Sequence, residues 1–186
     1  MSRAMTSPST PPPSFDPGST AQGFTDTWRR VVTEPRAFFA EMPQVGGLRD
    51  PLLFLGLCAA LNALGVMVWH MSLSAAIGTL LRSVLQGVVL AAVATLVAQQ
   101  LFDGPAGFEP MFRVVAYAAA PLAVAWLPGL GVLAQVYAWL LAIRGVETVQ
   151  RMDAAKAVMS VAIGVGLLCY AGIGYGHPGI PHCVGR

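Results

Sequence analysis

The chain has 186 residues, of which 55% are hydrophobic and only 11% charged, and its formal net charge is +2. Soluble proteins carry about 25% charged residues, so this composition excludes an ordinary water-soluble globular domain. A net charge this small also gives no electrostatic reason to expect nucleic-acid binding.

The first 23 residues form a tail rich in Ser, Thr and Pro. This composition is typical of a disordered or polyproline-like segment, and the tail lacks the apolar core of a signal peptide. We therefore expect residues 1–23 to lie outside the folded part of the chain.

Residues 24–50 are predicted to form a cytoplasmic amphipathic segment, with Trp28, Phe38 and Phe39 on its apolar face and arginines elsewhere. Two interpretations of that face stay open. It lies in the lipid headgroup region, as aromatic and arginine-rich helices do, or it packs against the protein's own membrane helices.

A helix restart is expected in the middle of this segment. Thr33 is expected to cap the new helix and Pro35 to occupy its first turn.

Residues 51–176 are predicted to form an all-α, polytopic membrane helix bundle. An ionised side chain at the bilayer centre costs roughly 2.5–3.5 kcal/mol, so membrane spans are usually free of charges. Four long stretches here contain no Asp, Glu, Lys or Arg: Pro51–Leu81, Ser83–Phe102, Val114–Ile143 and Ala157–Gly185.

The first two spans are predicted at about residues 51–71 and 83–102, with the milder segment 72–81 at the interface. The last span is predicted at about residues 157–175, followed by an external tail at residues 177–186.

The central block has two readings, because Pro128-Gly129 lies near its middle. A hairpin gives two short spans, 112–128 and 129–146, whereas a single long kinked helix gives one. Spans need about 17–25 residues, so each hairpin arm is at the short end of that range.

The distribution of basic residues favours the hairpin. With five spans, nine basic residues share the amino-terminal side and only Arg82 and Arg186 lie opposite, whereas the single helix lowers this split to seven against four. Because cytoplasmic loops are enriched in Lys and Arg, we expect a cytoplasmic amino terminus and an external carboxyl terminus. A hairpin that enters and returns without crossing gives the same split.

Two arginines and one proline stand out in the hairpin. Arg113 and Arg144 lie at its open end, where they either bind an anion such as a lipid phosphate or act as anchors that set the topology. Pro121 interrupts the third span, which serves either helix packing or a substrate pathway.

Uncharged polar residues in or near the spans are expected to form hydrogen bonds between helices. These are Asn62, Gln86, Gln99, Gln100 and Gln135. No ionisable relay, nucleophile–base pair or standard metal motif is recognised, so we expect no catalytic site, no metal and no cofactor.

The order of these elements resembles the Yip family of small membrane proteins, first known as partners of Ypt/Rab GTPases. The matching residues are Trp28, Pro35, Phe38, Phe39 and Met42, then Arg113, Tyr117, Ala118 and Pro121, then Pro128-Gly129, Gly145-Val146 and Ala155-Lys156-Ala157. The resemblance covers roughly Phe24–Tyr175 and implies five helices, a cytosolic amino terminus and no known catalytic site.

One family motif is missing. Relatives have an Asp-Leu-Tyr-Gly-Pro-like segment before the first span, and this chain has Leu48-Arg49-Asp50-Pro51-Leu52 without the Tyr-Gly. Rab binding is therefore not carried over to this chain.

These features predict a non-enzymatic multi-pass protein that recruits partners or organises membrane, with a small-solute transporter or channel as the alternative. Expected partners are the lipid bilayer, other membrane or cytoplasmic proteins and a second copy of the chain. A single lysine among eleven basic residues is typical of GC-rich genomes and indicates a bacterial cytoplasmic membrane.

Overall fold

The structure is a computed structural model that describes residues 20–171, and all regular secondary structure in this part is helical. The predicted all-α class is therefore confirmed. The external tail predicted at residues 177–186 lies outside the described residues. In chain order the elements are α1 Thr20–Thr33, α2 Pro35–Glu41, α3 Arg49–His70, α4 Leu73–Phe102, α5 Phe108–Ala118, the 3-10 helix η2 Ala120–Val124, α6 Leu130–Gln150 and α7 Ala154–Tyr170.

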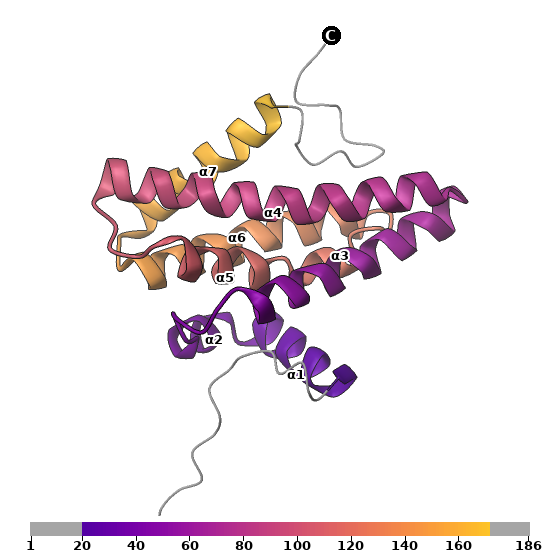
Figure 1. The fold of residues 1–186 in the computed structure, drawn as a ribbon, viewed down its shortest axis with the longest axis horizontal. Coiled ribbons are helices and arrows are strands. Elements are labelled where there is room, and N and C mark those ends of the chain that lie inside the picture. Colours follow the sequence, from indigo (N-terminus) through magenta and orange to yellow (C-terminus); the bar gives the residue numbers. More distant parts are fainter. Residues whose placement is uncertain (1–19, 172–186) are drawn as a thin grey trace, which may run out of the picture.

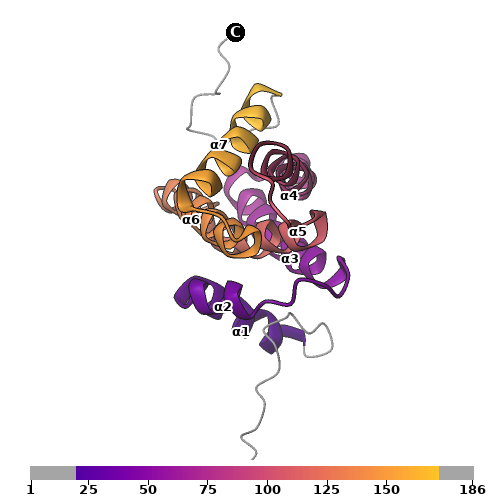
Figure 2. The same cartoon turned by 90° about the vertical axis from the view of Figure 1, so that its left-hand side faces the viewer.

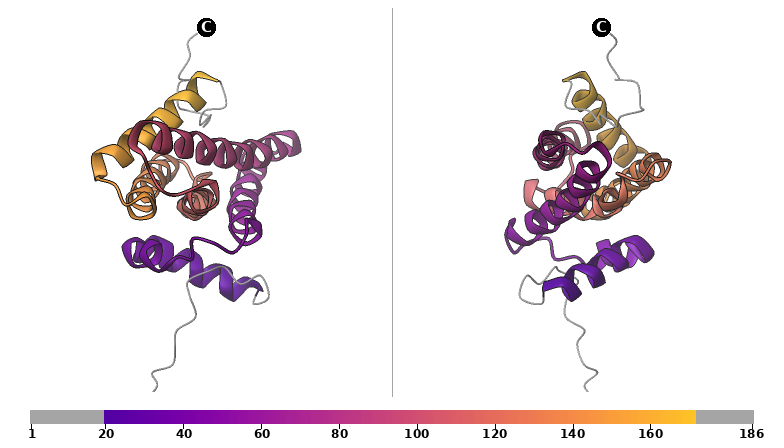
Figure 3. Two further views of the ribbon diagram at one scale, coloured as in Figure 1. Left: turned by 60° about the vertical axis from the view of Figure 1, so that its left-hand side comes forward. Right: turned by 90° about the vertical axis from the view of Figure 1, so that its right-hand side faces the viewer.

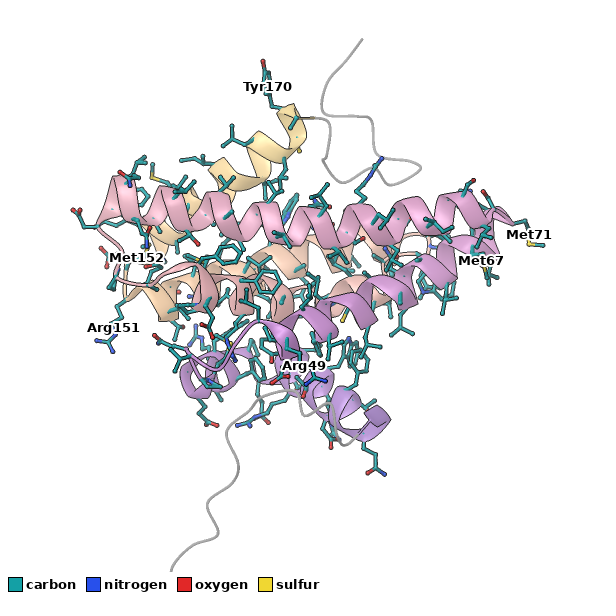
Figure 4. All side chains as sticks on the ribbon, viewed as in Figure 1. Arg49, Met67, Met71, Arg151, Met152 and Tyr170 are labelled. Atoms are coloured by element: carbon teal, nitrogen blue, oxygen red, sulfur yellow. The ribbon has the colours of Figure 1, made fainter. Side chains whose placement is uncertain are left out.

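The helices form a bundle with an additional layer on one side. Figures 1 and 2 show α3 to α6 packed together, with α1 and α2 as a separate layer along one flank and α7 on the opposite flank. Figure 3 shows that α3 begins next to that layer and ends at a tight turn that leads into α4. In Figure 4, Met67 and Met71 mark one end of the bundle, and Arg151 and Met152 mark the other.

Within residues 20–171, three helices are long and apolar enough to cross a membrane: α3, α4 and α6. The apolar helix α7 is shorter, with 17 described residues, and α5 has 11. The outer surface of the bundle is apolar, since large side chains such as Leu64, Leu85 and Leu133 are more than half exposed. In water such a surface would cause association, whereas in lipid it is favourable.

Several helix boundaries differ from the predicted ones. α1 begins at Thr20 rather than Phe24 and includes Gly23 in its first turn. α4 begins at Leu73 and continues through Arg82, so the segment expected at the interface is part of one 30-residue helix. Ser72 starts that helix, since its hydroxyl oxygen accepts a hydrogen bond from the Ala75 N–H at 3.3 Å.

The start of α2 confirms one expectation and corrects another. Pro35 occupies the first turn of α2, as predicted, but the residue at the capping position is Glu34 and it makes no side-chain capping bond. The Thr33 hydroxyl instead donates to the Arg29 carbonyl oxygen at 2.9 Å. This bond to the preceding turn is a common alternative for Thr in a helix.

The central block folds back on itself, but its first arm is not one regular helix. α5 ends at Ala118, and the chain continues as η2, in which Pro121 cannot donate a backbone hydrogen bond. The turn before α6 contains Gly129 with φ +81, a left-handed conformation that favours glycine. The predicted helix over residues 112–128 is therefore replaced by a helix, a 3-10 turn and a loop.

The open end of this hairpin is closed by one buried side chain. Gln150, at the end of α6, accepts from the Ala106 N–H at 3.0 Å and donates to the Ala106 carbonyl oxygen at 3.2 Å. The segment from Ala106 to Gly129 therefore runs antiparallel to α6, beside its whole length of 21 residues. At 1.5 Å per residue that is about 31 Å, close to the thickness of a hydrocarbon core.

Candidate functional site

Aromatic rings join the amino-terminal layer to the bundle. Phe38 and Phe39 of α2 are buried, and the Phe38 ring centroid lies 5.1 Å from that of the fully buried Tyr117 in α5. Tyr117 in turn packs on Phe54 of α3 at 5.1 Å, and Phe24 of α1 packs on Phe54 at 5.2 Å. Such tilted and edge-on pairs contribute about 0.5–1.5 kcal/mol each beyond their buried area.

Two long-range hydrogen bonds hold α1 on the hairpin. The Trp28 indole N–H donates to the Ala120 carbonyl oxygen in η2 at 2.8 Å. The Tyr137 hydroxyl in α6 donates to the Val32 carbonyl oxygen at 2.6 Å. Of the two interpretations of the apolar face, packing against the protein's own helices therefore describes this structure.

Arg113 forms a latch between the loop before α3 and the start of α5. Its side chain is 2% exposed, and its Nη2 donates to the Gly47 carbonyl oxygen at 2.7 Å. Glu109 completes the latch, because its Oε1 accepts from the Gly47 N–H at 2.7 Å and lies 3.5 Å from Arg113 Nη2. Gly46 and Gly47 have φ of +138 and +89, so the loop needs glycine at both positions.

Arg144 lies elsewhere. It is exposed on α6, where it pairs with Glu147 at 3.0 Å on the same helix. An exposed pair of this kind contributes little to stability. The two arginines predicted at the open end of the hairpin are therefore not combined into one anion site.

Pro121, which was also predicted as a candidate residue, is buried in η2 next to Ala120, whose carbonyl oxygen accepts the hydrogen bond from Trp28. Trp28, Phe38, Phe39, Tyr117 and Pro121 thus gather at the contact between the layer and the bundle, and Arg113 holds the loop that follows the layer. Sequence reasoning named these residues from a pattern, and the structure places them in packing and latching positions.

The opposite face of the layer is polar and exposed. Its exposed side chains are Asp26, Arg29, Thr33, Glu34, Arg36 and Glu41. Arg30 pairs with Glu41 at 2.6 Å, which links α1 to the end of α2. The layer therefore presents a mixed-charge surface while its aromatic face is covered.

A cavity of about 550 Å³ lies between α3, α4, α5, η2 and α6. Its lining changes in character along its depth. His70, Gly78 and Arg82 are exposed at the end near the α3–α4 turn, whereas Leu55 and Leu90 are buried at the other end. The amide side chains Asn62, Gln86 and Gln135 lie along the wall.

The uncharged polar residues noted in the spans differ in their hydrogen bonding. The Gln99 Nε2 donates to the Ala106 carbonyl oxygen at 3.1 Å, as expected for a bond between segments. No hydrogen-bond partner is found among the described residues for Asn62 Oδ1, Gln86 Nε2 or Gln135 Nε2. Sequence reasoning recognised these three amides but had no means of predicting that they share one cavity.

Among residues 20–171 no group of three His, Cys, Asp or Glu side chains is placed to hold a metal ion.

Comparison with known families places the chain in a family. The family model described as the Yip1 domain matches residues 29–176, most of the chain, from the second half of α1 through the whole of α7. Comparisons with curated proteins and with solved structures gave no significant match.

Proposed function

The chain belongs to the Yip1 domain family, and from this premise we propose a non-enzymatic membrane protein that recruits partner proteins, or organises membrane, through its amino-terminal layer. The observation that supports this most is the orientation of the layer. Its aromatic residues are covered by the bundle, and its exposed face carries charges of both signs, including Arg29 and Arg36. A fixed, polar, mixed-charge surface on a membrane anchor is suited to binding a protein with complementary charges.

The proposal includes five membrane-inserted helices with the amino terminus in the cytoplasm of a bacterial cell. The hairpin closed by Gln150 and Ala106 supports it, because both ends of that hairpin then lie on one side. The distribution of basic residues favours that side as the cytoplasmic one.

The layer also constrains the tilt of the bundle. α1 contacts the hairpin near Ala120, so a bundle standing upright would put exposed charges such as Arg29 opposite hydrocarbon. We therefore place the bundle at a tilt, with the layer at the cytoplasmic water interface. Tilted helices are common in membranes.

Photo-crosslinking in cells tests the recruiting role. A crosslinking amino acid placed at Arg29 or Arg36 should capture the same partner from both positions, because both are on the exposed face of the layer. The same amino acid at Lys156, exposed at the start of α7, is the matched control and should not capture that partner.

Charge reversal then tests the surface itself. With the crosslinking amino acid at Arg29, Arg36→Glu should abolish the crosslink, and with it at Arg36, Arg29→Glu should do so, whereas Lys156→Glu should leave both crosslinks intact. Alanine variants of Phe38 or Phe39 are unsuitable here, because both side chains are buried and their loss would unfold the layer. Equal crosslinking at Lys156, or a yield unaffected by the reversal, would contradict the recruiting role, and a crosslink to a second copy would identify the partner as the chain itself.

A small-solute transporter or channel is the second candidate, and the cavity favours it. Vesicles containing the purified protein should then show solute flux that protein-free vesicles lack. Absence of flux across neutral, anionic and cationic solutes would remove this candidate without affecting the first.

A further inference from the structure

The cavity contains buried polar groups that the fold does not satisfy. Gln86 and Gln135 are 7% and 5% exposed, and their Nε2 atoms have no hydrogen-bond partner among the described residues. Asn62 Oδ1 is likewise without a partner and lines the same cavity. A buried polar group left unpaired costs about 1–3 kcal/mol, so three in one cavity indicate an occupant that pairs with them.

The cavity has a polarity gradient along its depth. Arg82 and His70 are at the exposed end, the three amides follow, and Leu55, Leu90 and Val115 line the buried end. Thr79 and Ser83 also lie along the wall, but their hydroxyls donate to carbonyl oxygens of their own helix at 2.8 Å. The amides are therefore the groups left to bind an occupant.

The charge of the lining restricts the occupant. Arg82 is a permanent cation, and the described lining residues include no Asp or Glu. An anionic group is therefore favoured at the mouth, and a cationic ligand is disfavoured. The two Nε2 groups need acceptors, which ester oxygens supply, and Asn62 Oδ1 needs a donor, which a headgroup hydroxyl or a water molecule supplies.

The mouth opens beside a lipid-facing surface. Leu81 and Leu85, which flank Arg82 on α4, are 64% and 51% exposed. A ligand that enters here comes from the bilayer, and the apolar buried end provides a place for hydrocarbon. A soluble phosphate ester would leave that apolar end without a matching group.

We propose that this cavity binds one anionic glycerophospholipid, with its phosphate at Arg82, its glycerol ester region at the amides and one acyl chain toward Leu55, Leu90 and Val115. The order of anion, hydrogen-bonding linkage and hydrocarbon in such a lipid is the order of the lining residues from mouth to buried end. A volume of about 550 Å³ accommodates part of a lipid, so the second chain stays in the bilayer. The site is independent of the recruiting role, and only the placement of its mouth in the outer leaflet rests on the proposed topology.

The test uses the full chain in phosphatidylcholine vesicles that contain a phosphatidylglycerol probe with a photoreactive group on one acyl chain. After illumination, mass spectrometry of peptides should find label at Leu55, Leu90 and Val115. Label at the exposed Leu57 and Leu133 reports lipid that merely surrounds the protein and is the internal reference.

Three variants separate the contributions. Gln86→Leu with Gln135→Leu removes two buried donors at similar volume and should lower the cavity label about tenfold or more relative to the reference positions. Arg82→Gln should remove the preference for the phosphatidylglycerol probe over a phosphatidylcholine probe. Arg144→Gln, which removes an exposed arginine outside the cavity, should change neither measurement.

The results can overturn the proposal in three ways. Label confined to the exposed positions would mean that no acyl chain enters. Cavity label equal for both probes and insensitive to Arg82→Gln would mean that the site does not select an anionic lipid. Cavity label abolished by water-soluble glycerol phosphate at the concentration of the probe would assign the site to a soluble phosphate ester. Arg82 is exposed, so its variant remains informative even if the double Gln variant does not fold.

Discussion

Removing the two hydrogen bonds that anchor α1 should release the amino-terminal layer while the bundle stays folded. The perturbation is Trp28→Phe combined with Tyr137→Phe, which leaves an aromatic ring at each position and deletes the indole N–H and the hydroxyl. The lost bonds join Trp28 to Ala120 at 2.8 Å and Tyr137 to Val32 at 2.6 Å, and both are partly buried.

The expected size of the effect follows from the two bonds. A typical intramolecular hydrogen bond contributes about 1 kcal/mol net, so the double variant loses about 2 kcal/mol of docking free energy. Since about 1.4 kcal/mol corresponds to a factor of ten, the undocked layer becomes roughly 30-fold more populated. The smaller ring at position 28 also loses apolar contact, so this factor is a lower limit.

Hydrogen exchange followed by mass spectrometry measures that population. Backbone amides of α1 and α2 should exchange about 30-fold faster in the double variant, and amides of α3, α4 and α6 should be unchanged. The control is Tyr170→Phe, because Tyr170 is 84% exposed at the end of α7. A change of less than threefold in α1 and α2, or an equal change in the control, would refute the docked arrangement.

The remaining predictions concern single positions, each measured as the thermal stability of the purified protein in detergent unless stated. A methyl group at Gly145 would overlap Val114, so Gly145→Ala should lower the free energy of unfolding by about 1–3 kcal/mol. Gly166→Ala, whose methyl group would meet open space, should be neutral or slightly stabilising. Equal effects of the two substitutions would contradict the close packing of α5 on α6. Arg113→Met should cost about 1.5–3 kcal/mol and make the loop at residues 43–48 more sensitive to protease, and an unchanged cleavage rate would argue against the latch. Ser72→Ala should cost about 1 kcal/mol, and no loss would mean that this hydroxyl does not cap α4.

The class of the fold could be predicted from sequence because charge-free stretches have one dominant physical explanation. α3, α4 and α6 each overlap those stretches over most of their length, although α4 continues through Arg82 and α6 past Arg144, and the two-arm hairpin was expected from Pro128-Gly129 and the positions of the arginines. The internal form of the hairpin was harder to predict. Pro121 indicates a break, but whether the chain kinks or continues as a 3-10 turn depends on the helices packed around it.

Which surface covers the aromatic face of α1 and α2 was not predictable, for a related reason. Periodicity shows that Phe38 and Phe39 lie on an apolar face, but lipid and protein cover such a face equally well. The cavity depends on a three-dimensional coincidence, since Asn62, Gln86 and Gln135 come from three different helices. A single polar residue in a span predicts a hydrogen bond between helices, and only the packed structure shows that one polar atom of each of these three amides has no partner among residues 20–171.

The most direct test of the account is the side of the membrane on which each end of the hairpin lies. Single cysteines at Gly107, Asp153 and Ser74, in a chain with its three native cysteines replaced by alanine, can be labelled with a membrane-impermeant maleimide in intact cells and in inverted vesicles. The account predicts that Gly107 and Asp153 react only in inverted vesicles and that Ser74 reacts only in intact cells. Labelling of Gly107 and Asp153 from opposite sides would contradict the hairpin and the proposed topology with it.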